Sequence, residues 1–210
     1  MINILLGLCA YNIFEDYMKM DSKTDLKLID NHINFFHVIS SSTLLFQSYI
    51  INYPTLFNFL ITTNTLGYFI HDALKYIKKR KWKKTDLVFI YHHLSSVIYI
   101  YSVYQTNTSY WKEVLLIAEL SNIPTVINYN YIQHNRLSPG KYDNQIKELL
   151  PIHLYWYGGF RVIGLSYITI KELMNNDLNI YIMMTFPLLL MGYVWTYSLY
   201  IKYTNEIKVN

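Results

Sequence analysis

Long apolar runs, separated by short charged stretches, dominate this sequence and most constrain its fold. A helix of about 20 apolar residues crosses roughly 30 Å of hydrocarbon. Six runs have about this length, with ends uncertain by several residues: about 33–52, 55–77, 86–105, 112–132, 150–171 and 179–201. The pattern predicts an all-α polytopic membrane protein, a bundle of about six transmembrane helices joined by short connections.

The composition agrees with this prediction. Of the 210 residues, 52% are hydrophobic and only 15% are charged, whereas about a quarter are charged in a typical soluble domain. The net charge of +4 comes from basic residues that flank the apolar runs, which argues against nucleic-acid binding. The single cysteine, Cys9, excludes an intramolecular disulfide and fits a small packing residue.

Basic residues are distributed unevenly between the two ends of these runs. If the N-terminus is cytosolic and the runs alternate in direction, all but three of the 18 basic residues fall in cytosolic segments. The exceptions are Lys112, Lys171 and Arg161. Cytosolic loops carry an excess of Lys and Arg, so the sequence predicts a multi-pass protein with both termini in the cytosol.

The ends of the chain differ from its central part. The predicted divisions are an N-terminal segment, 1–27, a helical domain, 28–204, and a cytosolic tail, 205–210. Residues 1–14 are apolar but lack the basic region of a cleaved signal peptide. They fit a buried or interfacial helix better than a span, and whether they span, lie on or are buried in the membrane stays open.

Ionisable residues inside the apolar runs are the candidate functional groups. Each costs about 2.5–3.5 kcal/mol at a bilayer centre and therefore needs a reason. At 1.5 Å per residue, five of them fall in one layer near the cytosolic side, and two more fall near mid-depth as a possible ion pair. The layer consists of His37, His71, Asp72, His92 and His93, and the pair is Glu119 with Arg161. The alternative is that these groups only hold helices together by hydrogen bonds.

The adjacent histidines cannot both face one small target, because neighbouring residues on a helix point about 100° apart. Asp86 shares a helix face with His93. We expect one histidine to face an internal cavity and the other to pack against it or orient it. A neutral imidazole held by a carboxylate is a general base, and Asp72 is the candidate carboxylate.

Other chemical motifs are missing from the sequence. It has seven histidines but no HxxxH or HExxH box, no GxSxG elbow and no P-loop, so no metal site is predicted. Pro124 kinks its helix and frees a carbonyl that Ser121 or Asn122 re-satisfies. The basic run 78–84 fits a topological anchor, or a contact for lipid headgroups or acyl-CoA phosphates.

An ordered set of these residues resembles the TLC homology domain, which is shared by ceramide synthases, translocating-chain-associating membrane proteins and small TLC-domain proteins. The resemblance covers about 30–203. Its motifs are "HxxxSS" at His37, "GYFIHDALKY" with Asp72, "TDLVFIYHHL" with Asp86 and the paired histidines, "AELSNIP" with Glu119 and Ser121, "WYGGFRVIG" with Arg161, and the closing "LLLMGYVWTYSLYIKY".

The resemblance implies a six-helix bundle around a cytosol-facing cavity, in the endoplasmic reticulum or a related membrane. It gives His92 and His93, with Asp72, a conditional catalytic role in N-acylation of a sphingoid base by acyl-CoA. It makes His37, His71, Asp86, Glu119, Ser121, Asn122 and Arg161 candidate lipid or cavity residues. Glu119 stands where ceramide synthases carry a second His-Asp motif, as in the small TLC-domain proteins.

Three functions follow from this resemblance. The favoured one is a protein of membrane lipid homeostasis that binds a lipid or acyl chain in its helix bundle, without a cofactor. The second is a ceramide synthase-like N-acyltransferase that uses acyl-CoA as a substrate. The third is a trafficking or translocation helper that acts by contact with a protein partner.

Overall fold

The computed structural model describes residues 2–20, 25–51, 53–78, 82–104, 110–175 and 180–209. These residues are almost entirely helical. The helices are α1 (Ile2–Lys19), α2 (Leu26–Ile50), α3 (Pro54–Ile77), α4 (Lys84–Tyr104), α5 (Tyr110–Leu137), α6 (Asp143–Gly158), the π-helical turn η1 (Gly159–Gly164), α7 (Leu165–Asn175) and α8 (Ile180–Val209). The described residues of the six apolar runs lie almost entirely in helices, and the run 150–171 is divided among α6, η1 and α7.

Local sequence signals set several helix ends. The Asp25 side chain accepts a hydrogen bond from the backbone N–H of Lys27 (2.9 Å) and caps α2. Pro54 occupies the first turn of α3, where a missing N–H costs nothing. Asp86 accepts from the backbone N–H of Lys83 (2.9 Å), which closes the first turn of α4.

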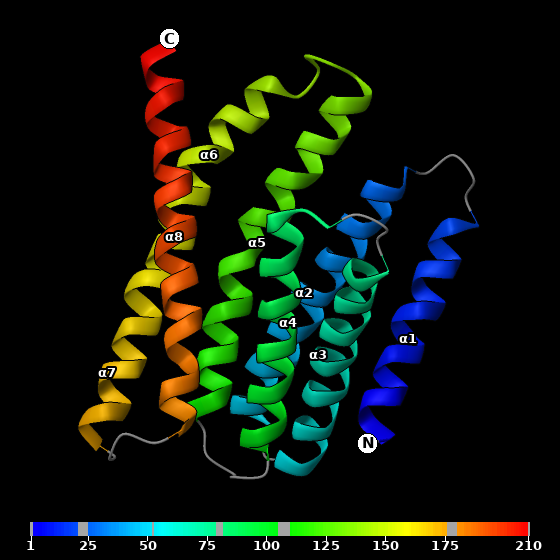
Figure 1. Ribbon diagram of the computed structural model, residues 1–210, viewed down its shortest axis with the longest axis vertical. Helices are drawn as coiled ribbons and strands as arrows, with labels where there is room; N and C mark the ends of the chain where they lie inside the picture. The colour runs from blue at the N-terminus through cyan, green and yellow to red at the C-terminus, as the bar shows by residue number, and fades with distance from the viewer. Residues whose placement is uncertain are drawn as a thin grey trace.

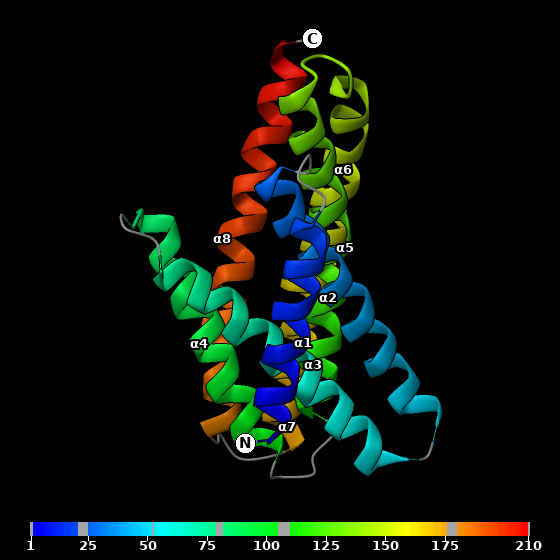
Figure 2. The same ribbon diagram turned by 90° about the vertical axis from the view of Figure 1, so that its right-hand side faces the viewer.

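Helices α1, α5 and α8 run roughly along the long axis of the molecule, while α2 and α3 are tilted from it, and the N- and C-termini lie at opposite ends (Figures 1 and 2). Helix α3 contacts α1, α2 and α4, while α5 contacts α2 and α6, and α8 contacts α6. Consecutive helices from α2 to α5 alternate in direction (Figure 1). Residues far apart in the sequence are therefore brought to the same height on neighbouring helices.

Two glycines let α1 lie directly against α3. A Cβ atom on Gly7 would lie 2.0 Å from the backbone oxygen of Thr63, and one on Gly67 would lie 2.4 Å from the backbone carbon of Gly7. No side chain fits at either position without moving a helix. This close approach buries Tyr11, one turn further along α1, in the core of the bundle.

The turn η1 interrupts the helical path from α6 to α7. Arg161 lies within it and is only 3% exposed. On the α8 side, a Cβ atom on Gly192 would lie 3.0 Å from Cβ of Arg161. A π turn holds one more residue per turn than an α-helix and frequently occurs at functional sites.

The membrane prediction is wrong. Among the described residues, no helix combines the length and the apolarity that crossing a bilayer requires. The apolar runs are interrupted every few positions by polar side chains, as in α2, which carries Asn31, Asn34, His37, Gln47 and three consecutive serines. The six transmembrane spans, the multi-pass location in the endoplasmic reticulum and the cytosolic sidedness of the termini and the cavity are corrected with it.

The apolar side chains are divided between the core and the exterior. Tyr11, Ile33, Ile61, Trp111 and Ile182 belong to one buried cluster that joins α1, α2, α3, α5 and α8. Many other large apolar side chains are exposed, including Phe46, Ile163 and Leu190. A high hydrophobic content therefore does not by itself measure the size of the core.

Candidate functional site

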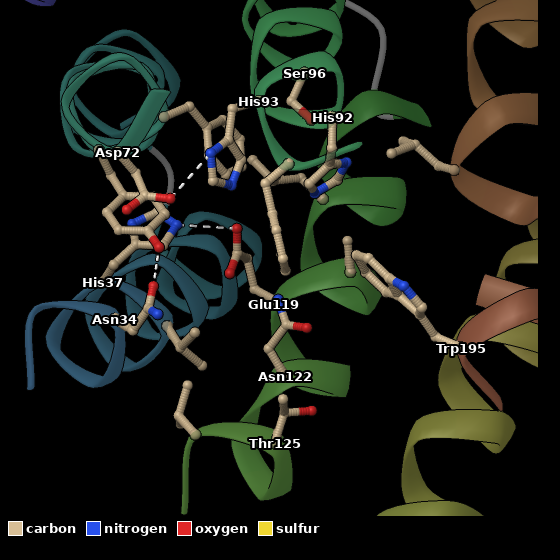
Figure 3. Close-up of a pocket in the computed structure, with 18 of the residues that line it drawn as sticks. Asn34, His37, Asp72, His92, His93, Ser96, Glu119, Asn122, Thr125 and Trp195 are labelled. Carbon is tan, nitrogen blue, oxygen red and sulfur yellow. Dashed lines mark hydrogen bonds and ion pairs between the residues drawn. The ribbon is translucent and has the colours of Figure 1, made fainter. Parts of the chain in front are cut away.

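A cavity of about 480 Å³ lies inside the bundle, within the usual range of 300–1,000 Å³ for small-molecule sites. Along α5 it extends from Val114 to Tyr129, about 22 Å at 1.5 Å per residue. Its walls come from α2, α3, α4, α5, α6, η1 and α8 (Figure 3). Its exposed end carries Asp30 and Tyr129, so the mouth lies there.

Three layers follow one another from the closed end to the mouth. The closed end is apolar and aromatic, and a polar belt crosses the middle. The wall between the belt and the mouth, called here the upper wall, mixes aromatic and polar groups. The closed end consists of Tyr99, Ile100, Val114, Leu115 and Leu188, the belt of His37, His92, His93, Ser96, Glu119, Asn122 and Arg161, and the upper wall includes Asp72, Lys75, Tyr76, Phe89, Val126 and Tyr129.

Seven of the ten candidate residues line this cavity: His37, Asp72, His92, His93, Glu119, Asn122 and Arg161. The other three lie outside its walls. His71 faces α1, Asp86 closes the first turn of α4, and Ser121 is fully buried behind Arg161. The structure thus separates the ten candidates into cavity residues and residues that hold helices or neighbouring side chains in place.

His93 and Asp72 form the closest histidine–carboxylate pair in the cavity wall (Figure 3). Nδ1 of His93 lies 3.1 Å from Oδ2 of Asp72, although the N–H direction is not aligned for a hydrogen bond. The His93 ring stacks on Phe69, with ring centroids 5.3 Å apart. A carboxylate on the Nδ1 side favours a proton there, which leaves the Nε2 lone pair available to accept one.

His92 lines the same cavity, so the expected division between a cavity-facing and a packing histidine is not what the structure shows. Its ring lies edge-on to Trp195. Burial, followed by the nearby His93 and the charge of Arg161, lowers the pKa of His92 to about 3. His92 is therefore neutral at physiological pH.

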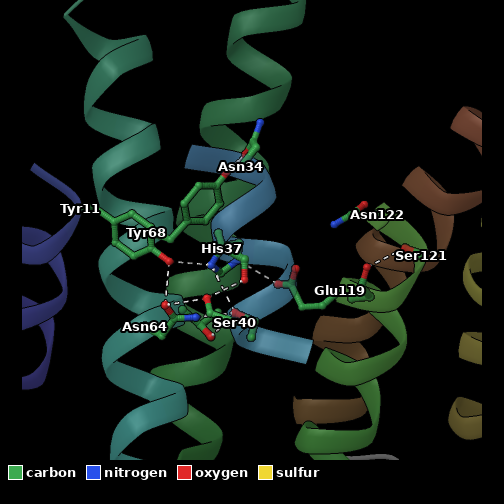
Figure 4. A network of polar contacts seen from close by, with 12 residues as sticks. Tyr11, Asn34, His37, Ser40, Asn64, Tyr68, Glu119, Ser121 and Asn122 are labelled. Atoms are coloured by element: carbon green, nitrogen blue, oxygen red, sulfur yellow. Dashed lines mark hydrogen bonds and ion pairs between the residues drawn. The ribbon is translucent and has the colours of Figure 1, made fainter. Parts of the chain in front are cut away.

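His37 lies at the centre of a polar network that links α1, α2, α3 and α5 (Figure 4). Its Nε2 lies 3.2 Å from Oε1 of Glu119, and its Nδ1 lies 3.3 Å from Oγ of Ser41 and 3.2 Å from the Tyr11 hydroxyl. Tyr11 donates to Asn64 (2.7 Å). Because the hydroxyl proton of Tyr11 is used in that bond, Ser41 donates to Nδ1 of His37, and Nε2–H of His37 donates to Glu119.

Arg161 does not pair with Glu119 as the sequence had suggested. Its Nε donates to Ser121 (2.7 Å), and its Nη2 donates to the carbonyl of Ala118 (3.1 Å) and to Asn122 (3.4 Å). Its guanidinium also lies 5.6 Å from the centre of the Tyr157 ring. Glu119 and Arg161 thus serve different networks, although both lie in the polar belt.

His71 belongs to an ion cluster between α1 and α3. Its Nε2 lies 2.7 Å from the carboxylate of Glu15, which also contacts Lys19 (2.6 Å) and Lys75 (3.3 Å). Burial raises the pKa of Glu15, but these cations outweigh it and leave the pKa below its ordinary value. Because Lys75 also contacts Asp30 (2.6 Å), the cluster ties α1 to the mouth of the cavity.

Sequence reasoning missed several residues of the site. Tyr11 comes from the segment whose role was left open. Trp195 lies in the closing motif but was not singled out, and Asn34 lies in no motif. Asn34 accepts a hydrogen bond from the hydroxyl of Tyr68, whose ring stacks on His37. For Tyr11 the available sequence signal was Gly7, one turn before it, because glycine in a helix marks close packing.

Parts of the earlier predictions lie outside the residues that the structure describes, namely Lys79, Arg80 and Lys81 of the basic run. Within the described ranges, no three His, Cys, Asp or Glu side chains are grouped as the ligands of a metal ion would be.

Comparison of the chain with family models, with curated proteins and with solved structures yields no match. The TLC-domain resemblance therefore rests on the sequence motifs alone.

Proposed function

We propose that this protein binds a lipid or a free acyl chain inside its helix bundle and acts in lipid homeostasis. The observation that carries the proposal is the layering of the cavity, in which an apolar closed end adjoins a belt of histidine, carboxylate and guanidinium groups. A molecule with one polar end and one apolar end matches both surfaces. A purely polar metabolite would leave Ile100, Val114 and Leu188 without an apolar partner.

Apolar wall is available on both sides of the belt. Val114 and Leu115 lie below it, and Phe89, Val126 and Trp195 lie above it. Burying one methylene group contributes about 0.8 kcal/mol, so even part of an acyl chain supplies several kcal/mol of binding free energy. The TLC-domain motifs support the same class of ligand.

The direct test is titration of the purified protein with a fluorescent polyene fatty acid, followed by displacement with oleate. Val114→Phe fills the cavity below the belt, and Val126→Phe fills it above. We expect at least one of them to weaken fatty-acid binding about tenfold or more, since the added ring occupies the space of several methylene groups. The matched control is Ile163→Phe, because Ile163 is 70% exposed. Equal affinity in all four proteins would contradict binding in the cavity.

A second candidate function is acyl transfer from acyl-CoA to an amine, and the His93–Asp72 pair favours it. In such a step Nε2 of His93 accepts a proton as the amine nitrogen forms a bond to the thioester carbon. The carbon–sulfur bond then breaks, and the proton passes to the thiolate leaving group.

This second candidate predicts release of free CoA thiol when acyl-CoA and a long-chain amine are both present. His93→Ala and Asp72→Ala should abolish the release, and His134→Ala, outside the cavity, should preserve it. Thiol release that is absent from the wild-type protein, or unchanged in both cavity variants, would remove the transferase candidate and leave the binding proposal intact.

A further inference from the structure

Arg161 differs from the other charged groups of the cavity in its partners. Asp72 faces His93, Glu119 faces His37, and Lys75 contacts Asp30. Arg161, in contrast, contacts no carboxylate within 4 Å among the described residues and is bound only by neutral acceptors. It is the one cavity cation in the described part of the chain whose charge no acidic side chain balances.

Burying the charge of Arg161 without an acidic partner has a high cost in free energy. Removing a guanidinium from water costs several kcal/mol unless an opposite charge or a full set of hydrogen bonds compensates. The three hydrogen bonds of Arg161 use Nε and Nη2, and none uses Nη1. A planar guanidinium has five donors in a fixed fork, so the two donors of Nη1 stay available in a residue that lines the cavity.

Neighbouring groups fit an anion beside Arg161. Tyr157, whose ring lies under the guanidinium, has a buried hydroxyl without a hydrogen-bond partner in the described chain. It is 3% exposed and lines the same cavity. His37 engages Oε1 of the Glu119 carboxylate, while Oε2 has no hydrogen-bond partner among the described residues. Ser121 and Asn122 hold the guanidinium in place from α5.

We infer that Arg161, with the Tyr157 hydroxyl, forms a subsite for the anionic head of the cavity ligand, a carboxylate or a phosphate ester. The inference rests on the proposed binding of a chain-bearing ligand and specifies its charge. Guanidinium groups bind both anions through paired, charge-assisted hydrogen bonds. The η1 turn fixes Arg161 in this position, because the turn places it on the α5 side of the helical path.

The test compares three ligands with the same twelve-carbon chain and different heads: dodecanoate, dodecyl phosphate and dodecanol. We expect the wild-type protein to bind both anions about tenfold or more tightly than the alcohol, the factor that one charge-assisted hydrogen bond supplies. Arg161→Gln should remove this preference while dodecanol still binds with unchanged affinity. Arg161→Lys should restore part of it.

The outcomes separate the two proposals. If the alcohol and the anions bind equally to the wild-type protein, the anion subsite is overturned and chain binding stands. If none of the three ligands binds, the proposed function itself fails. The wild-type comparison needs no variant, and dodecanol binding reports that Arg161→Gln is folded. Inorganic phosphate serves as a fourth ligand, since displacement of dodecyl phosphate by millimolar phosphate alone would show a site for the free ion and not for a lipid head.

Discussion

Nε2 of His37 and Oε1 of Glu119 lie 3.2 Å apart between α2 and α5, and the exposed fractions of the two side chains are 2% and 3%. The contact joins residues 82 positions apart in the sequence. A buried histidine and a buried carboxylate each need a partner, and here each supplies the partner of the other. The pair therefore connects the stability of the bundle to the chemistry of the cavity.

Replacing either member of this pair should destabilise the protein. Glu119→Ala leaves Nε2–H of His37 buried and unsatisfied, which costs about 1–3 kcal/mol in the free energy of unfolding. His37→Ala should cost a similar amount, and the double variant should cost less than the sum, because the second change removes a group that has already lost its partner. Urea unfolding of the four proteins measures the coupling, and strict additivity would argue against the contact.

The close approach of α1 and α3 makes a prediction about glycine. Gly7→Ala places a methyl group 2.0 Å from the oxygen of Thr63, so α1 must shift or detach, at a cost of about 1–3 kcal/mol. Hydrogen exchange should then rise along Ile2–Lys19. The matched control is Gly159→Ala, because a Cβ atom at Gly159 meets nothing within 4 Å. Equal exchange of α1 in the two variants would show that α1 does not depend on this contact.

The Asp72–His93 geometry predicts the tautomer of His93. With the carboxylate 3.1 Å from Nδ1, the neutral ring should carry its proton on Nδ1, and Nitrogen-15 NMR of the imidazole distinguishes this form from the Nε2–H form. Asp72→Ala should remove the preference and shift the population toward Nε2–H, the form that free imidazole side chains favour. Nε2–H as the main form in the wild-type protein would contradict the proposed base.

Buried histidines predict how stability depends on pH. Burial, followed by the charge of Lys202, lowers the pKa of His153 to about 4, so the unfolded chain binds a proton below about pH 6.5 that the folded chain does not. Its contribution to stability is complete above pH 6.5 and is lost as the pH falls toward 4. The melting temperature should fall over this window, and the fall should be smaller in His153→Gln.

The control for this prediction is His134→Gln, because His134 lies on α5 and is half-exposed. An identical pH profile for His153→Gln and the wild-type protein would assign the loss of stability to other groups. His92, whose pKa burial also lowers, adds to the same fall and stays in place in both variants.

The sequence predicted the positions of the helices, because apolar periodicity determines them. It expected the histidine layer and the Glu119–Arg161 pair at two depths, whereas His37, His92, His93, Glu119 and Arg161 line one cavity. His37 and Glu119 meet since they lie at matching heights on antiparallel helices. The height of a residue along the bundle does not determine which way its side chain points around the helix axis. The predicted Glu119–Arg161 pair was wrong for this reason, as Arg161, in the η1 turn, donates to Ser121 instead.

The membrane prediction failed for a different reason. It relied on the length of the apolar runs and on the distribution of basic residues, while the apolarity within each run decides whether a helix crosses a bilayer. In α5 the polar residues Glu119, Ser121, Asn122, Asn128 and Asn130 share one helix with the apolar ones. Two of these residues, Glu119 and Asn122, line the cavity, so polar groups that lower the apolarity of the run also belong to the site.

The contact between Gly7 and Gly67 also has a consequence for biosynthesis. Gly67 follows Gly7 by 60 positions, which a ribosome synthesises in about 3–12 s. During that interval the groove on α3 that receives α1 does not yet exist. Tyr11 and Glu15, the partners of His37 and His71, are therefore not buried against α3 until α3 is made. Helix α1 is made before α3 but packs only after α3 is made, and the polar network of the cavity is complete only then.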